Sequence, residues 1–104
     1  MVPVDPRITL QTLKVLGALL SNTGREVSGA EIGKTAGLAS GTLYPILIRL
    51  EQARWVRSWW ESEDPHQLGR PRRRFYSLTG IGKVKARAAF RELAASNQEL
   101  AWQY

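Results

Sequence analysis

One stretch, residues 28–51, constrains the fold of this chain more than any other. Its first residue, Ser28, stands three positions before Glu31, the spacing at which the two side chains satisfy exposed N–H groups at the start of a helix. Glycine can adopt a left-handed conformation without the steric penalty of a Cβ atom, so we expect this first helix to end at Gly37.

A second helix is predicted directly after this turn. Its apolar residues recur at intervals of three and four: Leu43, Ile46, Leu47 and Leu50. We expect Ser40 or Thr42 to cap its start and the helix to end near Ala53. Pro45 lies in the first turn if Thr42 is the cap, and bends the helix if Ser40 is the cap.

Two short helices joined by a glycine turn, the second with a polar leading edge, are typical of a helix-turn-helix. This pattern favours a DNA-binding protein. The alternative is an ordinary helical hairpin whose Ser and Thr residues only cap helices.

Two strands are predicted after the second helix. Residues 55–61 and 72–78 are rich in aromatic residues, and the 10 residues between them are too many for a tight turn, so we expect a loose loop. The run Gly69–Arg74 carries the densest positive charge in the chain. Such a ribbon after a helix-turn-helix is the wing of a winged helix, which either lies along a DNA backbone or is a solvated basic loop.

The acidic residues at the start of the predicted loop argue against DNA contact along the whole wing. Glu61, Glu63 and Asp64 precede the basic run. We therefore expect this half of the loop to face away from DNA, with only the Arg-rich return side approaching it.

Composition restricts the function further. The length of 104 residues indicates one domain, and the net charge of +6 favours an anionic partner. The absence of cysteine excludes a disulfide framework and a cysteine nucleophile. The only histidine, His66, lies in the acidic loop, and no nucleophile–base pair is visible, so we expect neither an enzyme nor a cofactor or metal. With no signal peptide or membrane span in the sequence, a cytoplasmic protein is expected.

The two ends of the chain are predicted to be helical. The first helix begins between Asp5 and Thr9, and the last runs from Thr79 towards Tyr104. The last helix has a stripe of heptad spacing with Asn97 at an inner position, which favours pairing with a second copy of the chain over folding back on its own domain. The residues expected at the dimer interface are Leu13, Phe90, Leu93, Asn97, Leu100, Ala101 and Tyr104.

Two motifs resemble one known family. The run from Ser40 to Glu51 (SGTLYPILIRLE) is similar to the recognition-helix signature of the PadR family of bacterial transcriptional regulators. The run from Gly69 to Gly82 (GRPRRRFYSLTGIG) resembles the basic wing and last-helix start of that family. The resemblance implies a winged-helix domain that dimerises through its terminal helices and represses transcription at a roughly palindromic operator.

One departure from the family pattern concerns the end of the recognition helix. Arg54 stands where the family usually has glycine, so either Arg54 is strained or the helix ends differently.

The resemblance also assigns candidate contacts with double-stranded DNA. It places Ser40, Thr42, Leu43 and Tyr44 at the DNA-facing start of the recognition helix, and Arg70, Arg72 and Arg73 on the wing. Gly41 permits close approach of the backbone at a helix start, and Lys34 is a further candidate for a phosphate contact.

Some side-chain roles stay open at the level of sequence. Leu43 either touches a thymine methyl group or belongs to the core, and Arg49 either reaches a phosphate or pairs with Glu51 and Gln52. Trp102 is either a hydrophobic anchor or, as in one branch of PadR-like regulators, part of a site for a flat aromatic effector at the dimer interface. Because the predicted helix start offers no long forked side chain, we expect modest direct base readout with a share from DNA shape.

The sequence thus predicts a mainly α fold with a small β-wing (α+β). A winged helix-turn-helix domain is expected over residues 1–78, with its helix-turn-helix at about 28–53 and its wing at about 55–78. Residues 79–104 are expected to form a C-terminal dimerisation helix. The predicted function is sequence-specific DNA binding by a dimeric repressor; the alternatives are a winged-helix protein-interaction module and a repressor that responds to a small molecule.

Overall fold

A computed structural model describes the backbone of residues 4–103 and the side chains of residues 4–96. In this part of the chain the elements are α1 (Leu10–Leu20), β1 (Val27–Ser28), α2 (Gly29–Ala36), α3 (Ser40–Gln52), β2 (Val56–Trp60), α4 (Pro65–Leu68), β3 (Arg74–Leu78) and α5 (Gly80–Gln103). The strands form one antiparallel sheet in the order β1-β3-β2. The predicted fold class, helix-rich with a small β-wing, is confirmed.

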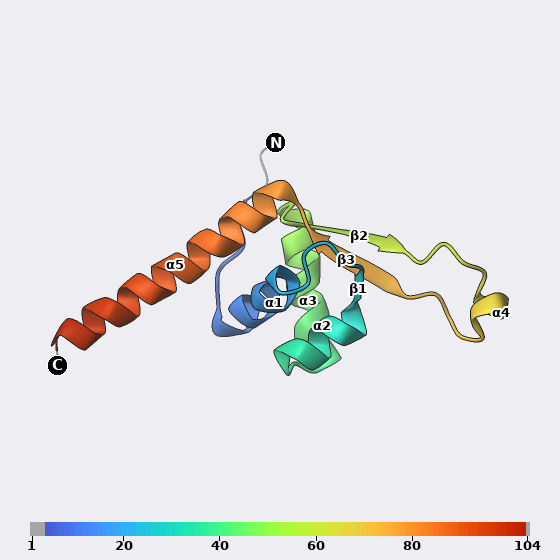
Figure 1. Ribbon diagram of the computed structural model, residues 1–104, viewed down its shortest axis with the longest axis horizontal. Coiled ribbons are helices and arrows are strands. Elements are labelled where there is room, and N and C mark those ends of the chain that lie inside the picture. The colour runs from blue at the N-terminus through green and yellow to red at the C-terminus, as the bar shows by residue number, and fades with distance from the viewer. Residues whose placement is uncertain (1–3, 104) are drawn as a thin grey trace.

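The arrangement in space has three parts (Figure 1). Helices α1, α2 and α3 gather beside the sheet, β2 and β3 extend away from them with α4 at the tip, and α5 runs out in the opposite direction. The core lies between α1, α2, α3 and the sheet. Its fully buried large side chains are Val15, Leu16, Ile32, Leu43, Leu47, Leu50 and Val56.

The first helix begins at the later of the two expected positions. Thr9 caps α1, and its hydroxyl accepts a hydrogen bond from the Thr12 N–H at 3.2 Å. Asp5 instead accepts hydrogen bonds from Trp55 Nε1 at 3.2 Å and from Lys85 Nζ at 2.9 Å. The bond from Lys85 is the main reason that the pKa of the Asp5 carboxyl lies below its ordinary value. The N-terminal arm is thereby tied to the start of the wing and to α5.

Both predicted ends of α2 are confirmed. The Ser28 hydroxyl accepts from the Glu31 N–H at 3.2 Å, and Gly37 ends the helix in the left-handed conformation with φ 69°. The Leu38 N–H then donates to the Gly33 carbonyl at 3.0 Å, which completes the turn into α3.

The end of α3 resolves the question raised by Arg54. Helix α3 ends as predicted near Ala53, and Arg54 adopts φ 64°, the conformation that glycine prefers. Its N–H donates to the Glu51 carbonyl at 3.0 Å, and the Trp55 N–H donates to the Leu50 carbonyl at 2.9 Å. These two bonds define a Schellman turn, so the geometry is the one glycine would give and Arg54 carries the strain.

Helix α5 is fastened to the rest of the domain at its first turn. The Thr79 hydroxyl donates to the Arg54 carbonyl at 2.6 Å and also accepts from the Gly82 N–H at 3.0 Å. The second bond caps α5, which begins where the sequence predicted. The Thr79 N–H donates to the Trp55 carbonyl at 2.9 Å. A Cβ atom built on Gly82 would lie 1.9 Å from that carbonyl oxygen, so only glycine allows this approach.

The wing differs from its prediction in two places. Its strands β2 and β3 fall within the expected ranges, but β1 pairs with β3 through Val27 and Tyr76 as a third strand that the sequence did not indicate. The prediction of a loose loop between β2 and β3 is also wrong, because this segment contains the short helix α4. Asp64 caps the short helix α4 by accepting from the His66 N–H at 2.9 Å, and Gly69 ends it at φ 68°.

Candidate nucleic-acid interface

The start of α3 is built differently from the sequence prediction. Ala39 occupies the cap position, and its carbonyl accepts from the N–H groups of Thr42 at 3.0 Å and Leu43 at 2.9 Å. The predicted caps, Ser40 and Thr42, lie inside the helix, and no side chain in the described part of the chain caps it. The prediction of a Ser40 or Thr42 cap is therefore wrong. Both residues are exposed.

Pro45 lies inside α3, beyond its first turn. A proline there cannot donate the hydrogen bond that the Gly41 carbonyl would otherwise accept. Gly41 itself is exposed, and no heavy atom lies within 4 Å of a Cβ atom built on it. The start of α3 thus presents an uncovered stretch of backbone together with the hydroxyl groups of Ser40 and Thr42.

Two glycines of α2 allow α3 to approach it closely. A Cβ atom on Gly29 would lie 2.6 Å from the Tyr44 hydroxyl oxygen, and one on Gly33 would lie 3.0 Å from Leu43 Cδ2. Tyr44 therefore lies against Gly29 while 38 % of its surface stays exposed. Leu43 is only 2 % exposed, so the structure places it in the core rather than on the surface, where it would have to be to meet a thymine methyl group.

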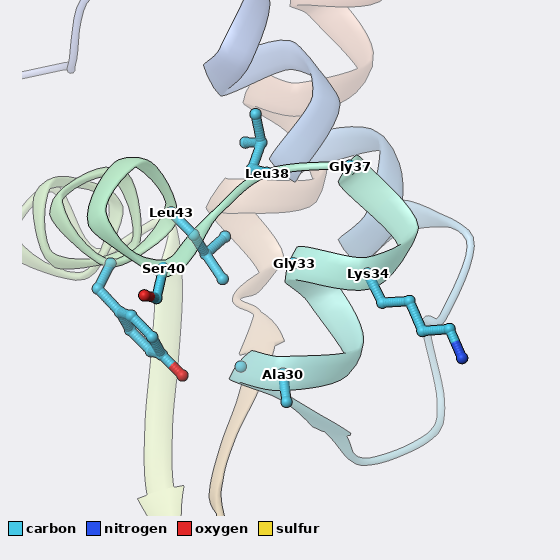
Figure 2. A pocket seen from close by; sticks show the side chains of 9 residues that line it. Ala30, Gly33, Lys34, Gly37, Leu38, Ser40 and Leu43 are labelled. Carbon is cyan, nitrogen blue, oxygen red and sulfur yellow. The ribbon is translucent and has the colours of Figure 1, made fainter.

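A shallow pocket of about 330 Å³ lies where α2 meets the start of α3 (Figure 2). Ser40 and Leu43 border it from α3, and Ala30 and Lys34 border it from α2. The Lys34 side chain extends outward from α2. Lys34 and Arg49 are both exposed, and neither forms an ion pair among the residues described. Arg49 is thus not paired with Glu51, which accepts from Ser58 and lies 3.9 Å from Arg74.

The structure divides the three predicted wing arginines into two kinds. Arg70 forms a bidentate ion pair with Glu61: its Nη1 donates to Oε1 at 2.7 Å and its Nη2 donates to Oε2 at 3.1 Å. This pair is the main reason that the pKa of the Glu61 carboxyl lies below its ordinary value. Arg72 donates only its Nε to the Glu63 carbonyl, at 2.9 Å, and both Arg72 and Arg73 are exposed. The charge of Arg70 is therefore balanced within the wing, whereas those of Arg72 and Arg73 face solvent.

The predicted dimer residues fall into three groups. Phe90 packs on the core of its own domain, and its Cζ lies 3.4 Å from a Cβ atom built on Gly17 of α1. Leu13 is half-buried, and Leu93 is 41 % exposed. The remaining residues lie outside those whose side chains the structure describes: Asn97, Leu100, Ala101 and Tyr104, together with the candidate effector residue Trp102.

One residue on α3 was missed by the reasoning from sequence. Ile48 lies one turn after Tyr44 and is 54 % exposed, although it is apolar and β-branched. The signal was present, because Ile48 falls outside the buried positions Leu47 and Leu50 in the spacing of this helix. The exposed side of α3 therefore mixes polar groups with one apolar side chain.

Comparisons with known proteins agree with this geometry. Residues 13–88 match the Transcriptional regulator PadR-like family. This chain belongs to the PadR-like family of transcriptional regulators. The resemblance noted in the sequence is thereby confirmed. A comparison with curated protein sequences gave no match.

Solved structures of PadR-like and other regulators share the fold. A PadR family transcription regulator from hypervirulent Clostridium difficile R20291 is 22 % identical, with a TM-score of 0.74 over 90 % of this chain and 97 % of that one. MepR, a transcription regulator of the Staphylococcus aureus multidrug efflux pump MepA, is 22 % identical, with a TM-score of 0.73 over 93 % of this chain. The chain spans 66 % of the length of that MepR structure. At these identities the likeness is one of fold.

Two further observations bear on the class of site. In the described part of the sequence, no three His, Cys, Asp or Glu residues are grouped so as to hold a metal ion. Among the described helices, none combines the length and apolar character needed to cross a membrane.

Proposed function

We propose that this PadR-like regulator binds duplex DNA as a homodimer and represses transcription at a roughly palindromic operator. The observation that carries the proposal is the exposed side of α3. Its polar start and Arg49 are exposed within a winged-helix fold, where the second helix of the helix-turn-helix enters the major groove.

The distribution of ion pairs supports the same surface. Arg25, Arg70 and Lys85 form ion pairs at 3.0 Å or less within the described residues. By contrast, Arg72 and Arg73 form none within residues 4–96. Cations whose charge is not balanced within the domain attract phosphate and release its counterions on binding.

The extended shape supports dimerisation. The longest dimension is 59 Å against 33 Å and 26 Å for the other two, and α5 projects beyond the body of the domain (Figure 1). Leu93 is 41 % exposed on this projecting helix. A second α5 packed against the first covers such apolar side chains, and two domains joined this way present two α3 helices to one duplex.

The direct test is a DNA-binding titration over a series of salt concentrations, with the region upstream of the chain's own gene as the duplex. Replacing Arg72 and Arg73 with Ala removes two proposed phosphate contacts. The log–log salt slope should then fall by about 1.8, at about 0.9 for each contact. A matched double replacement of Arg87 and Arg91, two exposed arginines of α5, removes the same charge and should leave the slope unchanged.

A second variant separates sequence preference from affinity. Replacing Tyr44 with Ala should weaken binding to the preferred duplex more than to a mixed-sequence duplex, because Tyr44 lies on the exposed side of α3. If the wild-type chain does not retain DNA even at low salt, the winged-helix domain serves protein interaction instead and the proposal is wrong.

A further inference from the structure

Glu61 stands at the neck of the wing, where β2 gives way to the loop that leads to β3. Its own N–H donates to the Arg73 carbonyl at 2.9 Å, which joins the two limbs of the loop at this point. Its carboxylate accepts three further hydrogen bonds: from Arg70 Nη1 at 2.7 Å, from Arg70 Nη2 at 3.1 Å and from the Arg73 N–H at 3.2 Å. The Glu61 side chain is only 12 % exposed as a result.

These bonds fix the backbone of the basic limb. The Arg73 N–H and carbonyl are both held by Glu61, and Arg72 is the adjacent residue. Arg72 also has a contact of its own, because its Nε donates a hydrogen bond to the Glu63 carbonyl at 2.9 Å. A forked arginine–carboxylate pair has a defined geometry, unlike a pair formed by lysine, so it holds a loop in one conformation.

We propose that Glu61 is a positioning residue for DNA binding, because its carboxylate closes the neck of the wing loop and so fixes the backbone from which Arg72 and Arg73 face the duplex. This inference rests on the DNA-binding function proposed above. It runs against simple electrostatics, since a carboxylate on a DNA-binding wing repels phosphate. By charge alone, neutralising Glu61 strengthens DNA binding, whereas the positioning role requires that binding weaken.

The two explanations predict opposite changes in DNA affinity when Glu61 is neutralised, so one experiment separates them. The variants Glu61→Gln and Glu63→Gln change the net charge equally on the same loop, and Glu63 contacts Arg72 only through its backbone carbonyl. Affinity is measured with a mixed-sequence duplex, because phosphate contacts do not depend on sequence. Glu61→Gln should weaken binding about tenfold, within the range of coupling energies in one hydrogen-bond network. Glu63→Gln should bind as tightly as the wild type or more tightly.

Two further measurements identify the route of the effect. If Glu61 acts through Arg72 and Arg73, Glu61→Gln should lower the salt slope by up to about 1.8 and should have no further effect once both arginines are replaced by Ala. Arg70→Lys keeps the net charge but loses the fork, so it should also weaken binding. In the free protein, backbone amides of residues 62–73 should exchange hydrogen faster in Glu61→Gln than in Glu63→Gln.

Each contrary result has a distinct meaning. If Glu61→Gln binds DNA as tightly as Glu63→Gln while the wild type binds normally, the positioning role is wrong and the proposed function stands. An undiminished loss after both arginines are removed likewise overturns it. If the wild type binds no duplex at all, the proposed function fails and this role fails with it. Should Glu61→Gln unfold, Arg70→Lys decides: wild-type affinity in that variant refutes the positioning role.

Discussion

Replacing Arg54 with Gly should stabilise the fold. Arg54 holds φ 64° at the end of α3, and the left-handed conformation costs a residue with a side chain about 1–2 kcal/mol. Glycine removes that cost but has more freedom in the unfolded chain, which offsets about 0.5–1 kcal/mol of the gain. The net expected increase in the free energy of unfolding is therefore about 0.5–1 kcal/mol.

Little else changes in this variant. The Arg54 side chain is exposed and has no hydrogen bond or ion pair within the described residues. The bonds that matter use its backbone: its N–H donates to the Glu51 carbonyl, and its own carbonyl accepts from the Thr79 hydroxyl. Glycine keeps both bonds.

The assay is chemical and thermal unfolding at equal protein concentrations, because self-association shifts apparent stability. The expected gain raises Tm by roughly 2–8 °C for a domain of this size. Arg54→Ala is the matched control, since it removes the same charge but still requires a positive φ. If Arg54→Ala gains as much stability as Arg54→Gly, the lost charge and not the backbone conformation is responsible, and the reasoning is refuted.

Three other predictions concern packing, association and pH. Gly82→Ala should lower the free energy of unfolding by about 3 kcal/mol in a denaturant titration, because its methyl group meets the Trp55 carbonyl, whereas Gly80→Ala, in open space, should not. Leu93→Glu should shift the molecule towards monomer in sedimentation measurements at micromolar concentration. Val84→Glu, at an exposed position of α5 outside the predicted dimer interface, should leave association unchanged. Because the folded-state pKa values of Asp5 and Glu61 lie below their unfolded values, both carboxyls stabilise the fold above the unfolded pKa, and this contribution is lost as the pH falls through the folded pKa. Unfolding free energies measured against pH should therefore fall less steeply in acid for Glu61→Gln than for the wild type; equal steepness would contradict the role of this pair.

Local signals explain which parts of the fold the sequence predicted. The cap at Ser28 and the stop at Gly37 each depend on a few neighbouring residues, and both were predicted. Strain at Arg54 was one of the two alternatives that the sequence left open. The start of α3 was misplaced because Ser40 and Thr42 are both good caps, while Ala39, a poor one, holds the position.

Contacts between distant residues were the ones that the sequence did not reveal. Strand β1 has two residues and exists because Val27 pairs with Tyr76, far along the chain. In the wing, the charge pattern showed an acidic half and a basic half, but not that Glu61 and Arg70 would pair across the loop. Likewise, only the packing of α3 against Gly33 reveals that Leu43 is buried. The roles of the candidate DNA-binding residues stay predictions.

Because Gly82 lies directly against the Trp55 carbonyl, α5 is joined to the domain by a short, rigid junction. With 24 residues, α5 is about 36 Å long at 1.5 Å per residue. Over about 36 Å, a rotation of about 5° at this junction would move the far end of α5 by about 3 Å. In a dimer built on α5, a small tilt at this joint changes the distance between the two α3 helices, and operator half-sites lie a fixed helical turn apart. In such a dimer, the close contact of Gly82 with the Trp55 carbonyl would keep the distance between the two α3 helices constant.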